Sequence, residues 1–134
     1  MATTRIIPMH INKGKTIAQC LSDRTEYAIN PDKTEDGEYV SSYACDPKTA
    51  DMEFLLSKRQ YWQVTGRTQQ SDVIAYQVRQ SFKPGEVTPE QANRIGYEFA
   101  KRFLKGEHAF IVATHTDKHH IHSQGILADP EDPV

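Results

Sequence analysis

The chain has 134 residues and a formal net charge of −2, and 37% of its residues are hydrophobic. This length fits one domain and this composition can fill a core, so two domains and wholesale disorder are excluded. The charge excludes a globally basic nucleic-acid binder, and two cysteines exclude a disulfide-rich secreted scaffold. No apolar run reaches the roughly 18 residues of a membrane span. A cytoplasmic protein without a membrane partner is therefore expected.

Periodicity and turn-forming residues predict eight elements in the order β-α-β-α-β-α-β-β. In chain order they are a strand at 5–11, a helix at 16–29, a strand at 38–45, a helix at 49–66, a strand at 72–82, a helix at 88–105, and strands at 108–115 and 120–128. Asn30-Pro31 ends the first helix, and Thr88-Pro89 starts the third with a hydroxyl cap. The hairpin and the alternating strands favour an α+β fold with a largely antiparallel sheet of about five strands covered by helices.

Apolar residues at helical spacing predict the buried side of the second and third helices. In the second helix this set is Met52, Leu55, Leu56 and Trp62. In the third helix it is Ala92, Ile95, Phe99 and Phe103. These residues are expected to pack against the sheet.

The segment 57–83 is locally basic, with five Lys or Arg residues against one Asp, although the whole chain is slightly acidic. Such a run usually marks a solvated surface. Arg67 lies within a stretch at 65–71 that also carries hydroxyl and amide groups. This mixture is also typical of a loop that contacts phosphates.

Four histidines lie within the eight residues 115–122. His120, His122 and Gln124 alternate along the last strand and therefore share one face, and an antiparallel hairpin brings His115 beside His120 or His122. Converging imidazoles can bind a divalent metal, and Asp117 can fix a ring tautomer as a hydrogen-bond acceptor. Exposed histidines in a polar turn are the alternative interpretation.

Three stretches together resemble the conjugative relaxases, the mobilisation nucleases of the HUH endonuclease superfamily. They are 23–34, with a Tyr before Asn-Pro-x-Lys-Thr; 76–92, with Gln-Ser-Phe-x-Pro-Gly-Glu; and 113–122, with the histidine motif. The resemblance covers about residues 1–123. It implies a single relaxase-like domain over 1–134, incomplete at its C-terminus, with the antiparallel sheet of that family.

The resemblance implies a DNA nickase. Tyr27 would attack a scissile phosphate in single-stranded DNA at an origin of transfer, and relaxosome accessory proteins are the further partners implied. A phenol has a pKa of about 10, so it needs activation, which a divalent metal (Mg²⁺ or Mn²⁺) can supply by polarising the phosphoryl oxygen. Asp117 is predicted to be catalytic together with Tyr27.

In the resembling family the metal ligands correspond to His115, His122 and position 124. Here position 124 is Gln124, a neutral amide that Mg²⁺ or Mn²⁺ tolerates, and His120 on the same strand face is the substitute ligand. Residues assigned to DNA binding are Arg67, Arg79 and Ser81.

Two other functions fit the same residues. A catalytically degenerate relaxase fragment would bind DNA without cutting it, which the glutamine at position 124 favours. The stretch 120–126 also loosely fits the histidine-triad pattern, in which His122 is the nucleophile toward a nucleotide α-phosphate. A covalent DNA adduct that depends on Tyr27 discriminates the relaxase from both alternatives.

Overall fold

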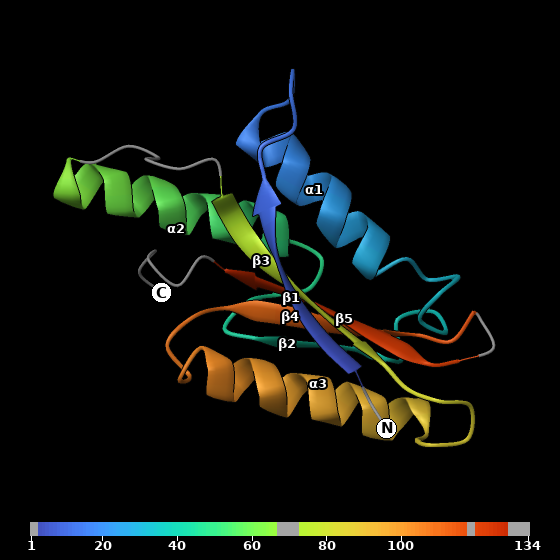
Figure 1. Ribbon diagram of the computed structural model, residues 1–134. Helices are drawn as coiled ribbons and strands as arrows, with labels where there is room; N and C mark the ends of the chain where they lie inside the picture. The colour runs from blue at the N-terminus through green and yellow to red at the C-terminus, as the bar shows by residue number, and fades with distance from the viewer. Residues whose placement is uncertain (1–2, 67–72, 118–119, 129–134) are drawn as a thin grey trace.

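The computed structural model describes residues 3–66, 73–117 and 120–128. A five-stranded sheet forms the middle layer, with α1 and α2 on one face and α3 on the other (Figure 1). The elements are β1 (Thr3–His10), α1 (Ile17–Ala28), β2 (Val40–Tyr43), α2 (Ala50–Thr65), β3 (Val73–Ser81), α3 (Pro89–Phe103), β4 (Phe110–His115) and β5 (His122–Ala128). The strand order is β1-β3-β5-β4-β2 and every pairing is antiparallel, which confirms the predicted α+β class and element order.

Local sequence signals account for where two of the helices begin and end. The Thr16 hydroxyl accepts a hydrogen bond from the amide of Gln19 at the start of α1. Thr88 and Gln91 form a capping box at the start of α3. α1 ends at Ala28, just before Asn30-Pro31, so its last turn carries Tyr27 toward the sheet.

Two clusters of buried side chains fill the space on either side of the sheet. The cluster on the α1 and α2 side includes Leu21, Phe54 and Ile126. The cluster on the α3 side includes Phe110 and Leu127. β5 contributes to both because successive side chains of a strand point to opposite faces.

The predicted buried side of α2 is wrong for Met52 and Leu56, whereas Leu55 packs against the core as predicted. Met52 is 68% exposed and Leu56 is 53% exposed. The residues that this helix buries most deeply are instead Ala50, Phe54 and Lys58. Packing against α1 and the sheet therefore selects a face of α2 that apolar spacing does not predict.

The prediction for α3 is wrong for Ile95 and Phe103, which are 41% and 42% exposed. The face that lies on the sheet is made of small residues, including Gly96 and Ala100. A Cβ added at Gly96 would lie 2.8 Å from Cγ1 of Val112. α3 approaches the sheet along these small residues, which leaves its larger apolar side chains at the flank.

The last strand begins at His122 rather than at the predicted residue 120. Thr116 leaves the β4–β5 ladder and donates its amide hydrogen to the carbonyl of Lys33, 2.8 Å away. The hairpin turn is thereby tied to the segment that follows α1.

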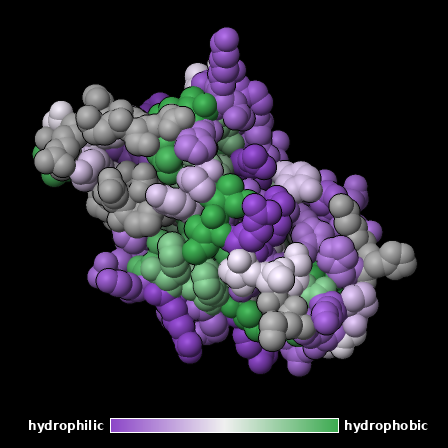
Figure 2. All heavy atoms as spheres, in the orientation of Figure 1, coloured by the Kyte–Doolittle hydropathy of each residue, from purple (hydrophilic) through white to green (hydrophobic). Residues whose placement is uncertain are grey.

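The surface is mixed. Figure 2 shows an apolar band across the middle of the face in view, bordered by hydrophilic residues. Among the described residues, no helix combines the length and apolar character needed to cross a membrane.

Candidate active site

The predicted histidine pair forms on the face of the sheet that α1 and α2 cover. His115 of β4 and His122 of β5 are directly opposite each other in the antiparallel register. Their ring centroids are 4.9 Å apart, and His115 Nδ1 lies 3.1 Å from His122 Nε2. His115 is completely buried, whereas His122 is partly accessible.

The protonation of these rings follows from their partners. His115 Nε2 lies 2.8 Å from the carbonyl oxygen of Ala28, which can only accept, so this nitrogen carries the hydrogen. In the neutral ring the lone pair of His115 Nδ1 then faces His122. Burial and the neighbouring His115 lower the pKa of His122 to about 4, so His122 is neutral near pH 7. Neutral imidazoles are the form that binds metals.

One nitrogen of the pair lacks a hydrogen-bond partner in the described part of the chain. His122 Nδ1 is buried and makes no hydrogen bond within the part of the chain that the structure describes. Buried polar atoms are almost always satisfied, and exceptions often mark a ligand site. The histidine pair is therefore a candidate ligand site.

Tyr27 joins the histidine pair from α1. Its ring meets the His115 ring edge to face, with 5.8 Å between the centroids. The bond from His115 to the Ala28 carbonyl fixes the end of the helix beside the sheet. Tyr27 is nevertheless 44% exposed, so the phenol is open to a large substrate.

Asp117 lies at the same place and is paired with a lysine that the sequence interpretation did not assign. Lys33 Nζ is 2.8 Å from Asp117 Oδ2 and 5.4 Å from the centroid of the Tyr27 ring. The hydrogen bond to Lys33 lowers the pKa of Asp117, and the same bond raises the pKa of Lys33. The place of Lys33 in the Asn-Pro-x-Lys-Thr stretch was the signal that could have identified it.

The donor set fits a divalent cation. His115, Asp117 and His122 each offer a ligand atom, and these atoms lie within 4.8 Å of one another. The 3.1 Å between the two facing ring nitrogens is the separation expected for neighbouring imidazole ligands about 2.1 Å from one metal. The neutral His122 ring and the ionised Asp117 carboxylate are also the protonation states that metal binding requires.

Gln124 and His120 lie further from this cluster. Gln124 is buried, and its Oε1 accepts a hydrogen bond from Gln77 Nε2 at 3.1 Å. The ring of His120 is exposed, and its centroid is 6.0 Å from that of His122.

The residues predicted to contact DNA are distributed along β3. Ser81 is opposite His122 and Arg79 is opposite Gln124, so both share the sheet face of the histidine pair. Arg79 Nε is buried without a partner among the described residues. Arg67 lies outside the described residues.

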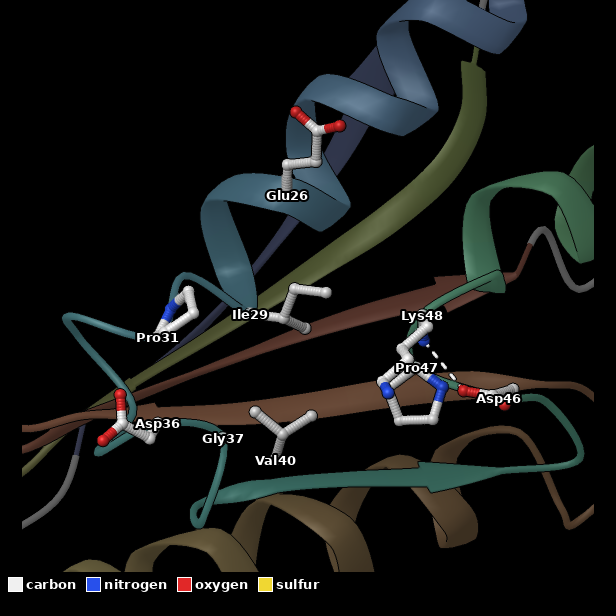
Figure 3. A pocket seen from close by; sticks show the side chains of 9 residues that line it. All are labelled: Glu26, Ile29, Pro31, Asp36, Gly37, Val40, Asp46, Pro47 and Lys48. Atoms are coloured by element: carbon white, nitrogen blue, oxygen red, sulfur yellow. Dashed lines mark hydrogen bonds between the residues drawn. The ribbon is translucent and has the colours of Figure 1, made fainter.

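A pocket of about 610 Å³ lies beside the C-terminal end of α1 (Figure 3). Its lining comes from α1, the turn after it, β2 and the loop before α2, with the residues Glu26, Ile29, Pro31, Asp36, Gly37, Val40, Asp46, Pro47 and Lys48. A hydrogen bond from the amide of Lys48 to Asp46 Oδ1 orders one rim. None of the predicted site residues lines this pocket, so it is separate from the histidine pair.

Comparison with known proteins agrees with the geometry. The family model described as relaxase, MobA/VirD2-like, nuclease domain matches residues 27–127. Protein rlx of Staphylococcus aureus is 39% identical over 90 residues, which are 67% of this chain and 26% of that protein. The group II intron-interrupted relaxase LtrB of Lactococcus lactis subsp. cremoris is 30% identical over 127 residues, covering 80% of this chain and 23% of LtrB. The chain thus spans about a quarter of the length of these curated relatives.

Proposed function

Because this chain belongs to the MobA/VirD2-like relaxase nuclease domain family, we propose that it nicks single-stranded DNA at an origin of transfer through Tyr27. The observation that carries the proposal is the 5.8 Å contact between the rings of Tyr27 and His115, whose partner is His122. An exposed phenol and a pair of imidazoles thus meet at one place in the structure, although they come from opposite ends of the chain.

The reaction is a transesterification. The Tyr27 oxygen forms a bond to the scissile phosphorus, the bond from phosphorus to the 3′ oxygen breaks, and the 3′ oxygen leaves as a hydroxyl group. The phenol loses its proton and the leaving oxygen gains one, so no water is consumed. The Lys33 ammonium, 5.4 Å from the centroid of the Tyr27 ring, places a positive charge beside the attacking phenol. Asp117 holds Lys33 in that position through their 2.8 Å ion pair.

His115 and His122 would hold a divalent cation, Mg²⁺ or Mn²⁺, with Asp117 as the nearest carboxylate. When bound, the cation supplies a Lewis acid that polarises the phosphoryl oxygen. Gln124 and His120 are the outer candidates for ligation. The oxygen of Gln124 is already bonded to Gln77, so it would have to exchange that partner.

Arg79 and Ser81, on the same sheet face, are the proposed contacts to the DNA backbone, together with Arg67. Arginine and hydroxyl side chains commonly position nucleic acid through its phosphates. The partner is therefore a single DNA strand lying over the β3–β5 part of the sheet. Relaxosome accessory proteins are the proposed additional partners.

A DNA-binding form without cleavage is the second candidate function. It is favoured by the hydrogen bond that engages Gln124 Oε1 at the position of the family's third metal ligand. In that case the strand binds and no covalent product forms.

The test is a covalent-adduct assay. Labelled single-stranded oligonucleotides covering the DNA that flanks the gene are incubated with the protein and Mn²⁺, and adducts are resolved under denaturing conditions. We expect an adduct with the wild type and none with Tyr27→Phe, while the control Tyr39→Phe still forms it. Binding without any adduct would support the second candidate. An adduct retained by Tyr27→Phe, or a nucleotide attached to His122, would contradict the nickase proposal.

A further inference from the structure

Two arginines face each other across the β1–β3 ladder. Arg5 is directly opposite Arg79, so both side chains point to the face that carries the histidine pair. Side chains in such positions have Cβ atoms about 5 Å apart, and like charges directly opposite each other destabilise a sheet. Arg5 was not singled out by any sequence motif.

Neither of these two cations has a counter-ion among the described residues. Within the described part of the chain, no carboxylate pairs with Arg5 or Arg79, whereas Lys15 and Lys33 each pair with an aspartate. Arg79 Nε is buried and makes no hydrogen bond to any described residue. An uncompensated pair of guanidinium groups, one with a buried unused donor, is a site for an external anion.

The neighbouring residues point to the kind of anion. In the next row of the same sheet face, Thr3 is opposite Ser81, Ser81 is opposite His122, and His122 is opposite His115. Two hydroxyl groups thus lead from the histidine pair toward β1. Because neighbouring strands are about 4.8 Å apart, this row extends about 10 Å from β5 to β1. Such a path accommodates an extended, repeatedly charged ligand.

The route ends at an open edge of the sheet. β1 is the first strand in the sheet order, and both Thr3 and Arg5 are exposed. A polymer bound at the histidine pair can therefore continue past Arg5 without meeting another strand.

We propose that Arg5 and Arg79 jointly bind one phosphate of the single-stranded DNA backbone, and that the strand leaves the active site across β3 toward the β1 edge. This inference rests on the proposed function, because it assigns the path of the same DNA substrate. The guanidinium forks match the oxygens of a phosphodiester, which supplies the charge that the arginine pair lacks. The arginine pair thus sets the direction of the strand relative to Tyr27.

The first test measures the binding of a fluorescent single-stranded oligonucleotide as a function of salt. We expect Arg5→Gln and Arg79→Gln each to weaken binding several-fold at low salt and to reduce the salt slope by about 0.7. The double variant is expected to lose little more than one single variant, because both arginines hold the same phosphate. The control is Arg102→Gln on α3, which lies on the opposite side of the sheet and should bind like the wild type.

Two further readouts distinguish a binding role from a structural one. Arg79→Gln removes one of two like charges that face each other across the strands. We therefore expect its Tm to equal or exceed that of the wild type. Methylphosphonate substitution at single positions should reveal one phosphate whose neutralisation weakens the wild type but not the Arg79→Gln protein. This phosphate is expected within a few nucleotides of the scissile bond.

The outcomes separate this inference from the proposed function. If Tyr27 forms an adduct while both arginine variants keep the wild-type affinity and salt slope, the arginine site is wrong and the nickase stands. If the arginine variants lose affinity as expected but no adduct forms, the path of the strand stands and cleavage fails. Equal losses in the Arg102→Gln control would also overturn the site.

Discussion

Two neighbouring pairs of residues on β4 and β5 differ in how their polar atoms are used. Thr114 and Ser123 are opposite each other and point toward α3, whereas His115 and His122, one position along, point toward α1. The hydroxyls of Thr114 and Ser123 bond to each other at 2.9 Å. His122 Nδ1, by contrast, is buried without a partner among the described residues.

On the α3 side, the hydrogen bonds of Thr114 and Ser123 extend to a third residue, Asn93. Asn93 of α3 donates to the carbonyl of Tyr39 at 2.8 Å and to Thr114 Oγ1 at 3.3 Å, and Ser41 donates to Asn93 Oδ1. Ser123 also donates to the carbonyl of Ala92. This network holds the helix on the sheet. Among the described residues it still leaves one buried acceptor of the α3 face, Gln80 Oε1, without a partner, as His122 Nδ1 is on the other face. The same two strands thus carry a hydrogen-bonded network on the α3 side, the structural side, and the candidate metal site on the α1 side, the functional side of the proposal.

The largest expected effect comes from breaking the functional side. His122→Ala should reduce adduct formation by about 100-fold or more, because it removes a proposed metal ligand near Tyr27. Mn²⁺ binding measured by calorimetry should weaken in parallel. The matched control is Ser123→Ala, the next residue on the same strand, which should keep Mn²⁺ binding. If His122→Ala forms as much adduct as the wild type, this imidazole has no part in the reaction.

A substitution on the structural side should lower the stability of the protein and leave Mn²⁺ binding intact. Asn93→Ala removes the amide donor to Thr114 Oγ1 and the acceptor of the Ser41 hydroxyl, so we expect the free energy of unfolding to fall by about 2–3 kcal/mol. Urea denaturation provides the measurement. The protein that remains folded should still bind Mn²⁺. A variant as stable as the wild type would mean that the network contributes nothing to the fold.

On the functional side, His122 should make the free energy of unfolding depend on pH. In metal-free protein, the pKa of His122 is lowered to about 4 from an ordinary value of about 6.5. Between these values the unfolded chain binds more protons, so the free energy of unfolding should fall by roughly 1–2 kcal/mol as the pH drops through this range. Denaturation at several pH values in the presence of a chelator measures this loss. His122→Asn should flatten the dependence, and an identical slope in that variant would exclude His122 as its source.

The smallest effect is expected at Lys33. Its ion pair with Asp117 is partly exposed and screened by solvent, so Lys33→Met should reduce the free energy of unfolding only slightly. The loss of the ammonium should also let the pKa of Asp117 rise toward its ordinary value, which an NMR titration can follow. If the carboxyl titrates unchanged in Lys33→Met, the contact is not present in solution.

The fold was predicted well where signals are local. The capping residues Thr16 and Thr88 and the proline after Asn30 placed helix boundaries, because caps and proline act within a few residues of themselves. The helix faces were predicted less well. Apolar spacing favoured Met52 and Ile95, but close approach at Gly96 and packing between α1 and α2 decided the buried faces.

The candidate site, like the fold, was predicted best where the signals are local. Period-two spacing and a hairpin predicted that His115 lies beside His120 or His122, since both signals act over a short stretch of chain. The register of the two strands decides for His122. The family resemblance of the three motifs is confirmed by the match over residues 27–127. The assignment of Tyr27 and the metal ligands to a reaction stays a prediction that the adduct assay tests.

By itself, the amino-acid sequence determined the element order, the helix caps and the pairing of histidines across one hairpin, because each depends on residues close in the chain. Only the tertiary structure decided that Lys33 lies over Tyr27 and that Arg5 faces Arg79. Those contacts arise when β1 and the turn after α1 meet strands far along the chain. Their positions depend on sheet order and register, which no local pattern of residues specifies.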